Sequence, residues 1–197
     1  MSKQAAEKAQ IVEAAYRCLA DTDGATASIT AILTAAGLST RAFYRHFQSK
    51  DGLLLTMFRE DADRVMQELR AQVAAAPTPT EALRALIHGM LRLTADPARR
   101  RRVLVLTSQE AQRARGYTAE LARFRAIQDS VISGILRSGL ADGSFPRAEP
   151  DSDARFIRAA LDQAFEEQMR QTSSLGPEEA AEQVCGFALR ALGARPA

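Results

Sequence analysis

The segment "ITAILTAAGLSTRAFYRHFQSK", residues 29–50, constrains the fold more than any other part of this 197-residue chain. Its first part carries apolar residues at helical spacing directly after Ser28, which is a good N-cap residue. Gly37 stops that pattern, and a second short helix is predicted from Ser39 to about His46. The segment therefore predicts two short helices joined by a tight turn.

The rest of the chain also predicts helices. β-Branched residues nowhere alternate with polar residues over the length of a strand, and alanine, leucine, arginine and glutamate are abundant. "TPTE" is the clearest helix start, because Thr78 is an N-cap, Pro79 stands at the first helical position and Glu81 completes a capping box. We expect an all-α fold of about nine helices, which cover Gln4 to Ala20, Ser28 to Gly37, Ser39 to His46, Gln48 to Pro77, Pro79 to Thr94, a stretch after Pro97, Tyr117 to Ser138, Asp151 to Arg170 and Pro177 to Leu192.

This order suggests two domains. Three short amino-terminal helices with a glycine-containing turn between the second and third are typical of a helix-turn-helix, whose second member enters the major groove of DNA. We expect a DNA-binding domain over residues 1–48 and a larger helical domain over residues 49–197.

The third predicted helix has two different faces. At about 100° per residue, one arc of the helical wheel is polar and basic and contains Thr40, Arg41, Tyr44 and Arg45. The opposite arc contains Ala42, Phe43 and His46. Arginine can bond two acceptors on guanine, threonine can touch a thymine methyl group or a phosphate, and each good base contact contributes roughly 1 to 3 kcal/mol of discrimination. The first arc is thus suited to contact DNA, although a solvated basic face on a small core helix is the alternative.

Charge is distributed in agreement with this prediction. The net charge is only +2, but no acidic residue occurs between Gly24 and Lys50. Lys50 lies at the start of the next helix, where its ammonium group and the free backbone N–H groups both favour a phosphate.

Other classes of function are poorly supported. The chain has two histidines and contains no nucleophile elbow, phosphate loop, paired metal-ligand motif or glycine fingerprint, so we expect no catalytic site, metal or cofactor. No apolar run is long enough for a membrane span and no signal peptide is recognisable, which predicts a cytoplasmic protein. Cys18 and Cys185 lie in apolar helical stripes and are expected to be buried thiols.

The segment "SITAILTAAGLSTRAFYRHFQSKDGLL" resembles the DNA-binding region of the tetracycline-repressor (TetR) family of bacterial transcriptional regulators, and Tyr44, Phe47 and Lys50 have the spacing typical of that family. The resemblance implies a homodimer that binds a partly palindromic operator and leaves it when a small molecule binds the carboxy-terminal domain. It also implies base or backbone contacts from the polar arc, and mainly phosphate contacts from Ser28, Thr30, His46 and Lys50. A helix cap for Ser28, an idle surface position for Thr30 and a structural role for His46 are the alternatives.

The carboxy-terminal helices offer weaker signals. An apolar effector cavity with a few polar groups is expected, and its candidate residues are His88, Phe124, Gln128 and Phe165. Each can equally be an ordinary core residue. The last two helices carry enough apolar residues to form a four-helix interface with a second copy of the chain.

Two further interpretations follow from the sequence. The run Arg99 to Arg102 is expected to open a solvated helix and to pair with nearby acids, with a role in DNA attraction or domain coupling as the alternative. A helical carrier or sensor of apolar ligands that does not bind DNA is the alternative function, and it leaves the basic arc unexplained.

Overall fold

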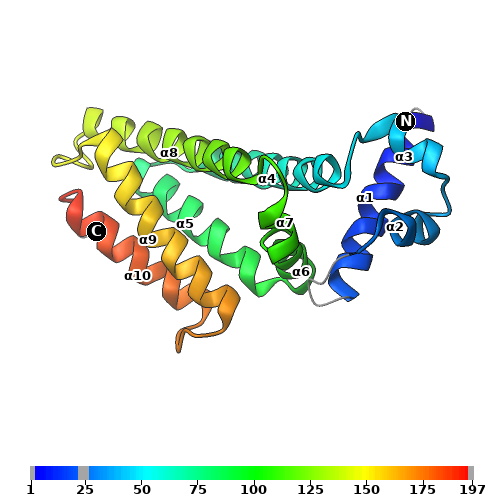
Figure 1. The fold of residues 1–197 in the computed structure, drawn as a ribbon. Helices are drawn as coiled ribbons and strands as arrows, with labels where there is room; N and C mark the ends of the chain where they lie inside the picture. The colour runs from blue at the N-terminus through cyan, green and yellow to red at the C-terminus, as the bar shows by residue number, and fades with distance from the viewer. Residues whose placement is uncertain (1–2, 22–26, 195–197) are drawn as a thin grey trace. The chain divides into compact units, whose positions relative to one another are not determined.

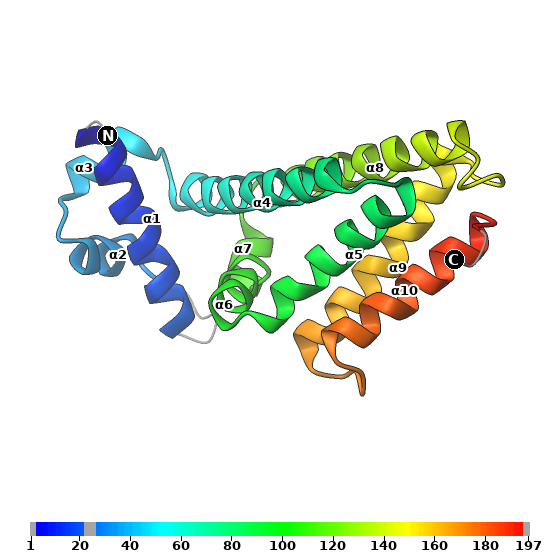
Figure 2. The same ribbon diagram turned by 180° about the vertical axis from the view of Figure 1, so that it is seen from behind.

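The computed structural model describes residues 3–21 and 27–194, and no strand occurs among them. The nine predicted helices are present in this described part, so the all-α expectation is confirmed. One further helix, α7, has five residues and was not predicted. The helices form two compact units, which are described separately (Figures 1 and 2).

The first unit comprises Met1–Ala62 and Arg101–Ala122. It contains α1 (Lys3–Asp21), α2 (Ile29–Ala36), α3 (Thr40–His46), the first part of α4 (Lys50–Ala75), the end of α6 (Pro97–Leu106), α7 (Gln109–Arg113) and the start of α8 (Tyr117–Ala141). Its apolar core includes the fully buried side chains of Ile11, Phe43 and Leu53. Because α1, α2 and α3 pack on one another through this core, the short α3 has a defined orientation.

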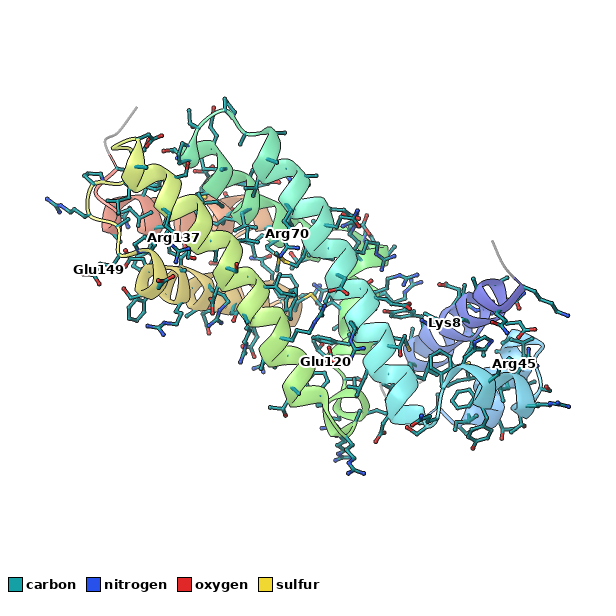
Figure 3. All side chains as sticks on the ribbon, turned by 90° about the horizontal axis from the view of Figure 1, so that it is seen from above. Lys8, Arg45, Arg70, Glu120, Arg137 and Glu149 are labelled. Carbon is teal, nitrogen blue, oxygen red and sulfur yellow. The ribbon has the colours of Figure 1, made fainter. Side chains whose placement is uncertain are left out.

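The second unit comprises Asp63–Arg100 and Arg123–Ala197. It contains the remainder of α4, the start of α6, most of α8, and α5 (Pro79–Ala95), α9 (Pro150–Arg170) and α10 (Pro177–Ala191). Helices α5, α9 and α10 lie side by side in both ribbon views and pack on one another (Figures 1 and 2). Helix α8 lies beside α4 (Figure 3). A guanidinium nitrogen of Arg123 on α8 lies 2.8 Å from a carboxylate oxygen of Asp63 on α4.

Most helix boundaries follow local capping, as predicted. Thr78 accepts a hydrogen bond from the Glu81 N–H at 3.2 Å, and Pro79 is the first residue of α5. Helix α4 begins at Lys50, two residues later than predicted, because Phe47 is in extended backbone and the hydroxyl of Ser49 accepts the Gly52 N–H at 3.1 Å. The local cap therefore decides where α4 starts.

A glycine in α8 permits close packing in the second unit. A Cβ atom added at Gly139 would lie 2.1 Å from Cδ2 of Phe145, whose ring is fully buried. Gly134 lies in the same helix, and a Cβ atom added there would meet nothing within 4 Å. Gly139 is thus buried against Phe145, whereas Gly134 is exposed and has open space beside it.

We predict opposite effects of alanine at these two glycines. Gly139→Ala lowers the free energy of unfolding by about 1 to 3 kcal/mol, because the buried Phe145 ring has to move. Gly134→Ala raises it by about 0.5 to 1 kcal/mol, because alanine has the better helix propensity. Urea unfolding followed by circular dichroism measures both, and equal shifts of the two variants contradict the packing role of Gly139.

Candidate nucleic-acid interface and effector site

Local capping and a glycine turn position α2 and α3. Ser28 caps α2 by accepting the Ala31 N–H at 3.0 Å, and Ser39 caps α3 by accepting the Ala42 N–H at 3.3 Å. Between the helices, Gly37 has φ of 66°, which lies in the left-handed region that glycine adopts without steric cost. The helix, tight turn and helix predicted from the sequence are thus present.

The two predicted faces of α3 are present as well. Ala42 and Phe43 are buried against the core of the first unit. The side chains of the opposite arc are exposed, and they are Thr40, Arg41, Tyr44 and Arg45. The ring of Tyr44 packs edge-on against Phe43, with 5.4 Å between the ring centroids, so the tyrosine stem is held while its hydroxyl group reaches outward.

The two arginines of this arc differ in their partners. Arg41 has no ion pair or hydrogen bond within the described part of the chain. Arg45 donates to Oε2 of Glu7 on α1 at 2.7 Å (Figure 3). Nε2 of His46 lies 3.3 Å from the same carboxylate oxygen. One acidic side chain that the sequence analysis did not identify therefore binds two predicted DNA contacts, Arg45 and His46.

Glu7 is electrostatically favoured as a carboxylate. The hydrogen bond from His46 is the main cause that lowers the pKa of Glu7, and the positive charge of Arg45 adds to it. A carboxyl group whose pKa is lowered in the folded chain contributes stability above its unfolded pKa, and that contribution is lost as the pH falls through the folded pKa. His46 thus faces α1, as the helical wheel predicted.

Lys50, the predicted phosphate contact, is close to an acidic side chain from α7. Its ammonium group pairs with Oε1 of Glu110. The other carboxylate oxygen, Oε2, accepts the backbone N–H of Ala27 at 3.3 Å. Thr30 is exposed, and its carbonyl oxygen accepts the Thr34 hydroxyl group at 3.0 Å. No periodicity in the sequence indicates α7, so reasoning from the sequence missed Glu110.

The arginine run at the start of α6 is largely paired, as predicted. Arg99 binds Glu68 at 2.7 Å within the second unit. Within the first unit, Arg102 binds Glu13 at 2.9 Å, and its guanidinium carbon lies 4.2 Å from the centroid of the Tyr16 ring.

Three of the four candidate effector residues lie in or against the core of the second unit. Phe124 and Phe165 are partly buried and pack on that core. Gln128 of α8 is 3% exposed, and neither its Nε2 nor its Oε1 atom has a hydrogen-bond partner. Leaving such a buried amide unsatisfied costs roughly 1 to 3 kcal/mol. Gln128 is therefore suited to bind a polar group of a ligand.

His88, the fourth candidate, has different surroundings. Its Nδ1 atom lies 2.8 Å from Glu178 and its Nε2 atom 2.9 Å from Glu182, both on α10. Arg84 donates to Glu182 at 2.8 Å, and this hydrogen bond is the main cause that lowers the pKa of Glu182. His88 is thus part of a polar link between α5 and α10, which agrees with the alternative of a structural histidine rather than with an effector contact.

A cleft of about 480 Å³ lies elsewhere in the second unit. It is lined by residues of α4, α5, α6 and α10, and six of these are polar or charged: Glu68, Gln72, Arg92, Asp96, Arg99 and Glu178. None of the four candidate effector residues lines this cleft. It differs in character from the apolar cavity that the sequence predicted.

The predicted dimer helices divide into core and surface residues. Most of their apolar side chains are buried within the second unit, including Ile157, Leu161 and Val184. Phe156 of α9 is 66% exposed and Phe187 of α10 is 46% exposed. These two aromatic side chains are the large apolar side chains that remain exposed on α9 and α10 in the described part of the chain.

The remaining chemistry is limited in the part of the chain that the structure describes. It contains no group of three or more His, Cys, Asp or Glu residues that could hold a metal ion. Neither Cys18 nor Cys185 forms a disulfide, and burial raises the pKa of Cys185 to about 11, so it is a thiol at neutral pH. Cys185 is buried as predicted, whereas Cys18 is only partly buried. No described helix has the length and apolar character of a membrane span.

Comparisons with known proteins agree with this architecture. Residues 11–57 match the family described as "Bacterial regulatory proteins, tetR family". The HTH-type transcriptional repressor Rv1474c of Mycobacterium tuberculosis is 28% identical over 172 residues, which cover 80% of this chain and 90% of that protein.

Two solved structures share the fold at low sequence identity. The regulator FadR from Bacillus subtilis in complex with stearoyl-CoA has a TM-score of 0.77 at 16% identity and covers 93% of this chain and 98% of its own. AibR in complex with isovaleryl coenzyme A and operator DNA has a TM-score of 0.67 at 18% identity, with coverages of 92% and 97%.

Proposed function

Because this chain belongs to the TetR family of bacterial regulatory proteins, we propose that it represses transcription from a palindromic operator and is released by a small, largely apolar molecule. The chain is a DNA-binding transcriptional regulator, as its relatives are. In this proposal residues 1–48 read the DNA, and residues 49–197 bind the effector and a second copy of the chain. A regulator of chromosomal genes acts in the cytoplasm.

The exposed arc of α3 is the observation that carries the proposal. It presents Thr40, Arg41, Tyr44 and Arg45 together on a helix whose opposite face is buried. We assign base reading chiefly to Arg41, because its guanidinium group has no competing partner in the described residues and can bond guanine in two places. Arg45 contacts DNA only if it exchanges Glu7 for a phosphate or a base. Ser28, Thr30 and Lys50 surround this arc as backbone contacts.

Dimerisation is supported by the exposed aromatic rings of α9 and α10. Full burial of a phenylalanine side chain contributes roughly 1.5 to 3 kcal/mol, and a twofold interface buries each of Phe156 and Phe187 twice. A dimer presents two copies of α3, and these match the two half-sites of a palindrome.

The effector proposal rests on Gln128. Its buried amide group can donate and accept hydrogen bonds, while Phe124 and Phe165 contribute apolar surface to the same unit. Phe124 and Phe165 fit the apolar chain of a ligand, and Gln128 fits one polar group that adjoins this chain. Two neighbours of the same fold were solved with acyl-CoA esters, so fatty acyl-CoA compounds are the first candidates to test. We assign His88 to the link between α5 and α10, because both of its ring nitrogens already face carboxylates.

Release requires coupling between the effector and the DNA. A thousandfold loss of operator affinity corresponds to about 4 kcal/mol, which has to come from a preference of the effector for one conformation. Helix α4 begins in the first compact unit and ends in the second. A shift of this single helix therefore moves residues of both units.

We predict different effects for two cationic residues of the interface. Arg41→Ala weakens binding to the operator by about 1 to 3 kcal/mol but leaves random duplex nearly unchanged, because it removes a base contact. Lys50→Ala weakens binding to both duplexes and lowers the salt slope by less than about 0.9, because it removes one phosphate contact made by a cation that already pairs with Glu110. Genomic fragments enriched on the purified protein supply the operator, and fluorescence anisotropy at two salt concentrations gives the affinities.

Two outcomes contradict this assignment. Equal losses for Arg41→Ala on operator and random duplex reject base reading by Arg41. The absence of any enriched fragment, together with a thermal shift by apolar compounds, favours the helical carrier without DNA binding over the repressor.

Gln128 generates a prediction with two readouts. Gln128→Leu raises the free energy of unfolding by about 1 kcal/mol, because it removes two unsatisfied buried atoms, and it abolishes the release of operator by stearoyl-CoA. Gln163→Leu is the matched control, because Gln163 is exposed and its amide group binds Glu167 at 2.7 Å. A Gln128→Leu variant that is less stable and still responds to the effector rejects the assignment.

We predict that charge at Phe156 breaks the dimer. Phe156→Glu yields a monomer in sedimentation velocity because a desolvated carboxylate opposes the interface. Leu140→Glu is the control, since Leu140 is 44% exposed but lies on α8, and this variant remains a dimer. Equal masses for both variants place the interface elsewhere.

A further inference from the structure

Helix α7 reaches the predicted DNA-binding surface through one side chain. The carboxylate of Glu110 pairs with the ammonium group of Lys50 and also accepts the Ala27 N–H at 3.3 Å. Ala27 directly precedes the cap of α2, and Lys50 is the first residue of α4. All three residues belong to the first compact unit. Glu110 therefore contacts the residue before the cap of α2 and the first residue of α4, which lie on either side of the helix-turn-helix α2–α3.

The two side chains of this pair differ in exposure. The Glu110 side chain is 9% exposed, whereas the Lys50 side chain is 23% exposed. The carboxylate is thus largely shielded, while the ammonium group remains open to a partner from outside. The neighbouring carboxylate of Asp51 accepts the Arg115 N–H at 3.1 Å.

A DNA phosphate and the Glu110 carboxylate are alternative partners of one cation. Lys50 at the start of α4 attracts a phosphate through its own charge and through the helix N-terminus. The same ammonium group is already neutralised by Glu110 in this structure. A cation that exchanges a carboxylate for a phosphate gains less binding free energy than a cation without a partner. It also releases fewer counterions from the DNA.

We propose that Glu110 limits the affinity of this protein for duplex DNA by competing with a backbone phosphate for Lys50. Glu110 is a positioning residue, because it acts through Lys50 and does not itself contact DNA. This inference rests on the proposed function, since it assumes that the surface around α3 binds DNA.

The substitution Glu110→Gln separates charge from geometry. Glutamine has nearly the same shape and keeps an oxygen that can accept the Ala27 N–H, but it carries no charge. Glu120→Gln is the matched control. Glu120 lies on α8 in the same unit, its side chain is 11% exposed, and it pairs with Arg59 rather than with a predicted DNA contact (Figure 3). Both variants change the net charge by the same amount.

The experiment measures binding of the full chain to a mixed-sequence duplex by fluorescence anisotropy between about 50 and 200 mM salt. No operator is needed, because a phosphate contact is independent of sequence. We expect Glu110→Gln to bind about fivefold more tightly at the lower salt concentration. We also expect it to steepen the salt slope by up to about 0.9. Glu120→Gln is expected to behave as the wild type does.

A double variant assigns the effect to Lys50. In a Lys50→Met background, Glu110→Gln is expected to leave the affinity unchanged, because the cation for which phosphate and carboxylate compete is absent. Circular dichroism melting verifies that each variant folds, and Glu110→Ala gives the same comparison if the glutamine variant does not fold.

The possible outcomes separate the two hypotheses. Wild-type protein that binds duplex, with Glu110→Gln equal to Glu120→Gln or weaker than it, overturns the role of Glu110 and leaves the proposed function intact. If Glu110→Gln still raises the affinity for duplex DNA in the Lys50→Met background, that result also overturns the role of Glu110. Wild-type protein that binds no duplex at any salt concentration contradicts the proposed function itself.

Discussion

Burial of Phe43 is the constraint on which the DNA-binding surface depends. Helix α3 has only seven residues, and a helix of that length is not stable alone in water. Phe43 is fully buried, and Phe47 packs beside it with 5.5 Å between ring centroids. These aromatic contacts hold α3 in one orientation, and the orientation decides that Arg41 and Tyr44 face outward. Without this small core the same residues would form no common surface.

Several cations of this surface form ion pairs with acidic side chains from helices outside the helix-turn-helix. Glu7 of α1 binds Arg45 and His46, and Glu110 of α7 binds Lys50. The face that the sequence presents as free of acids is thus partly neutralised in the folded chain. In the proposed mode of binding, DNA phosphates replace these carboxylates, so the affinity depends on residues that do not touch DNA. Arg41 remains the cation available without such an exchange.

In the second unit as well, the folded chain decides which polar side chains have partners. In the sequence His88 is flanked by apolar residues, and Gln128 lies at helical spacing from the apolar Phe124 and Val131. In the folded chain His88 lies between two glutamates of α10, whereas both polar atoms of Gln128 are buried without partners. A buried unsatisfied amide is costly in a stable protein, which makes Gln128 the stronger candidate for a ligand contact.

The sequence by itself determined nine of the ten described helices, the caps at Ser28 and Thr78 and the two faces of α3. These features depend on neighbours within about four residues, such as Ser28 with Ala31 or Thr78 with Glu81, and local patterns therefore predict them. Only the tertiary structure decided which cations are paired, because Glu7 lies 38 residues from Arg45 and Glu110 lies 60 residues from Lys50. Long-range pairs leave no periodic signal in a single sequence, since they depend on how separate helices pack against one another.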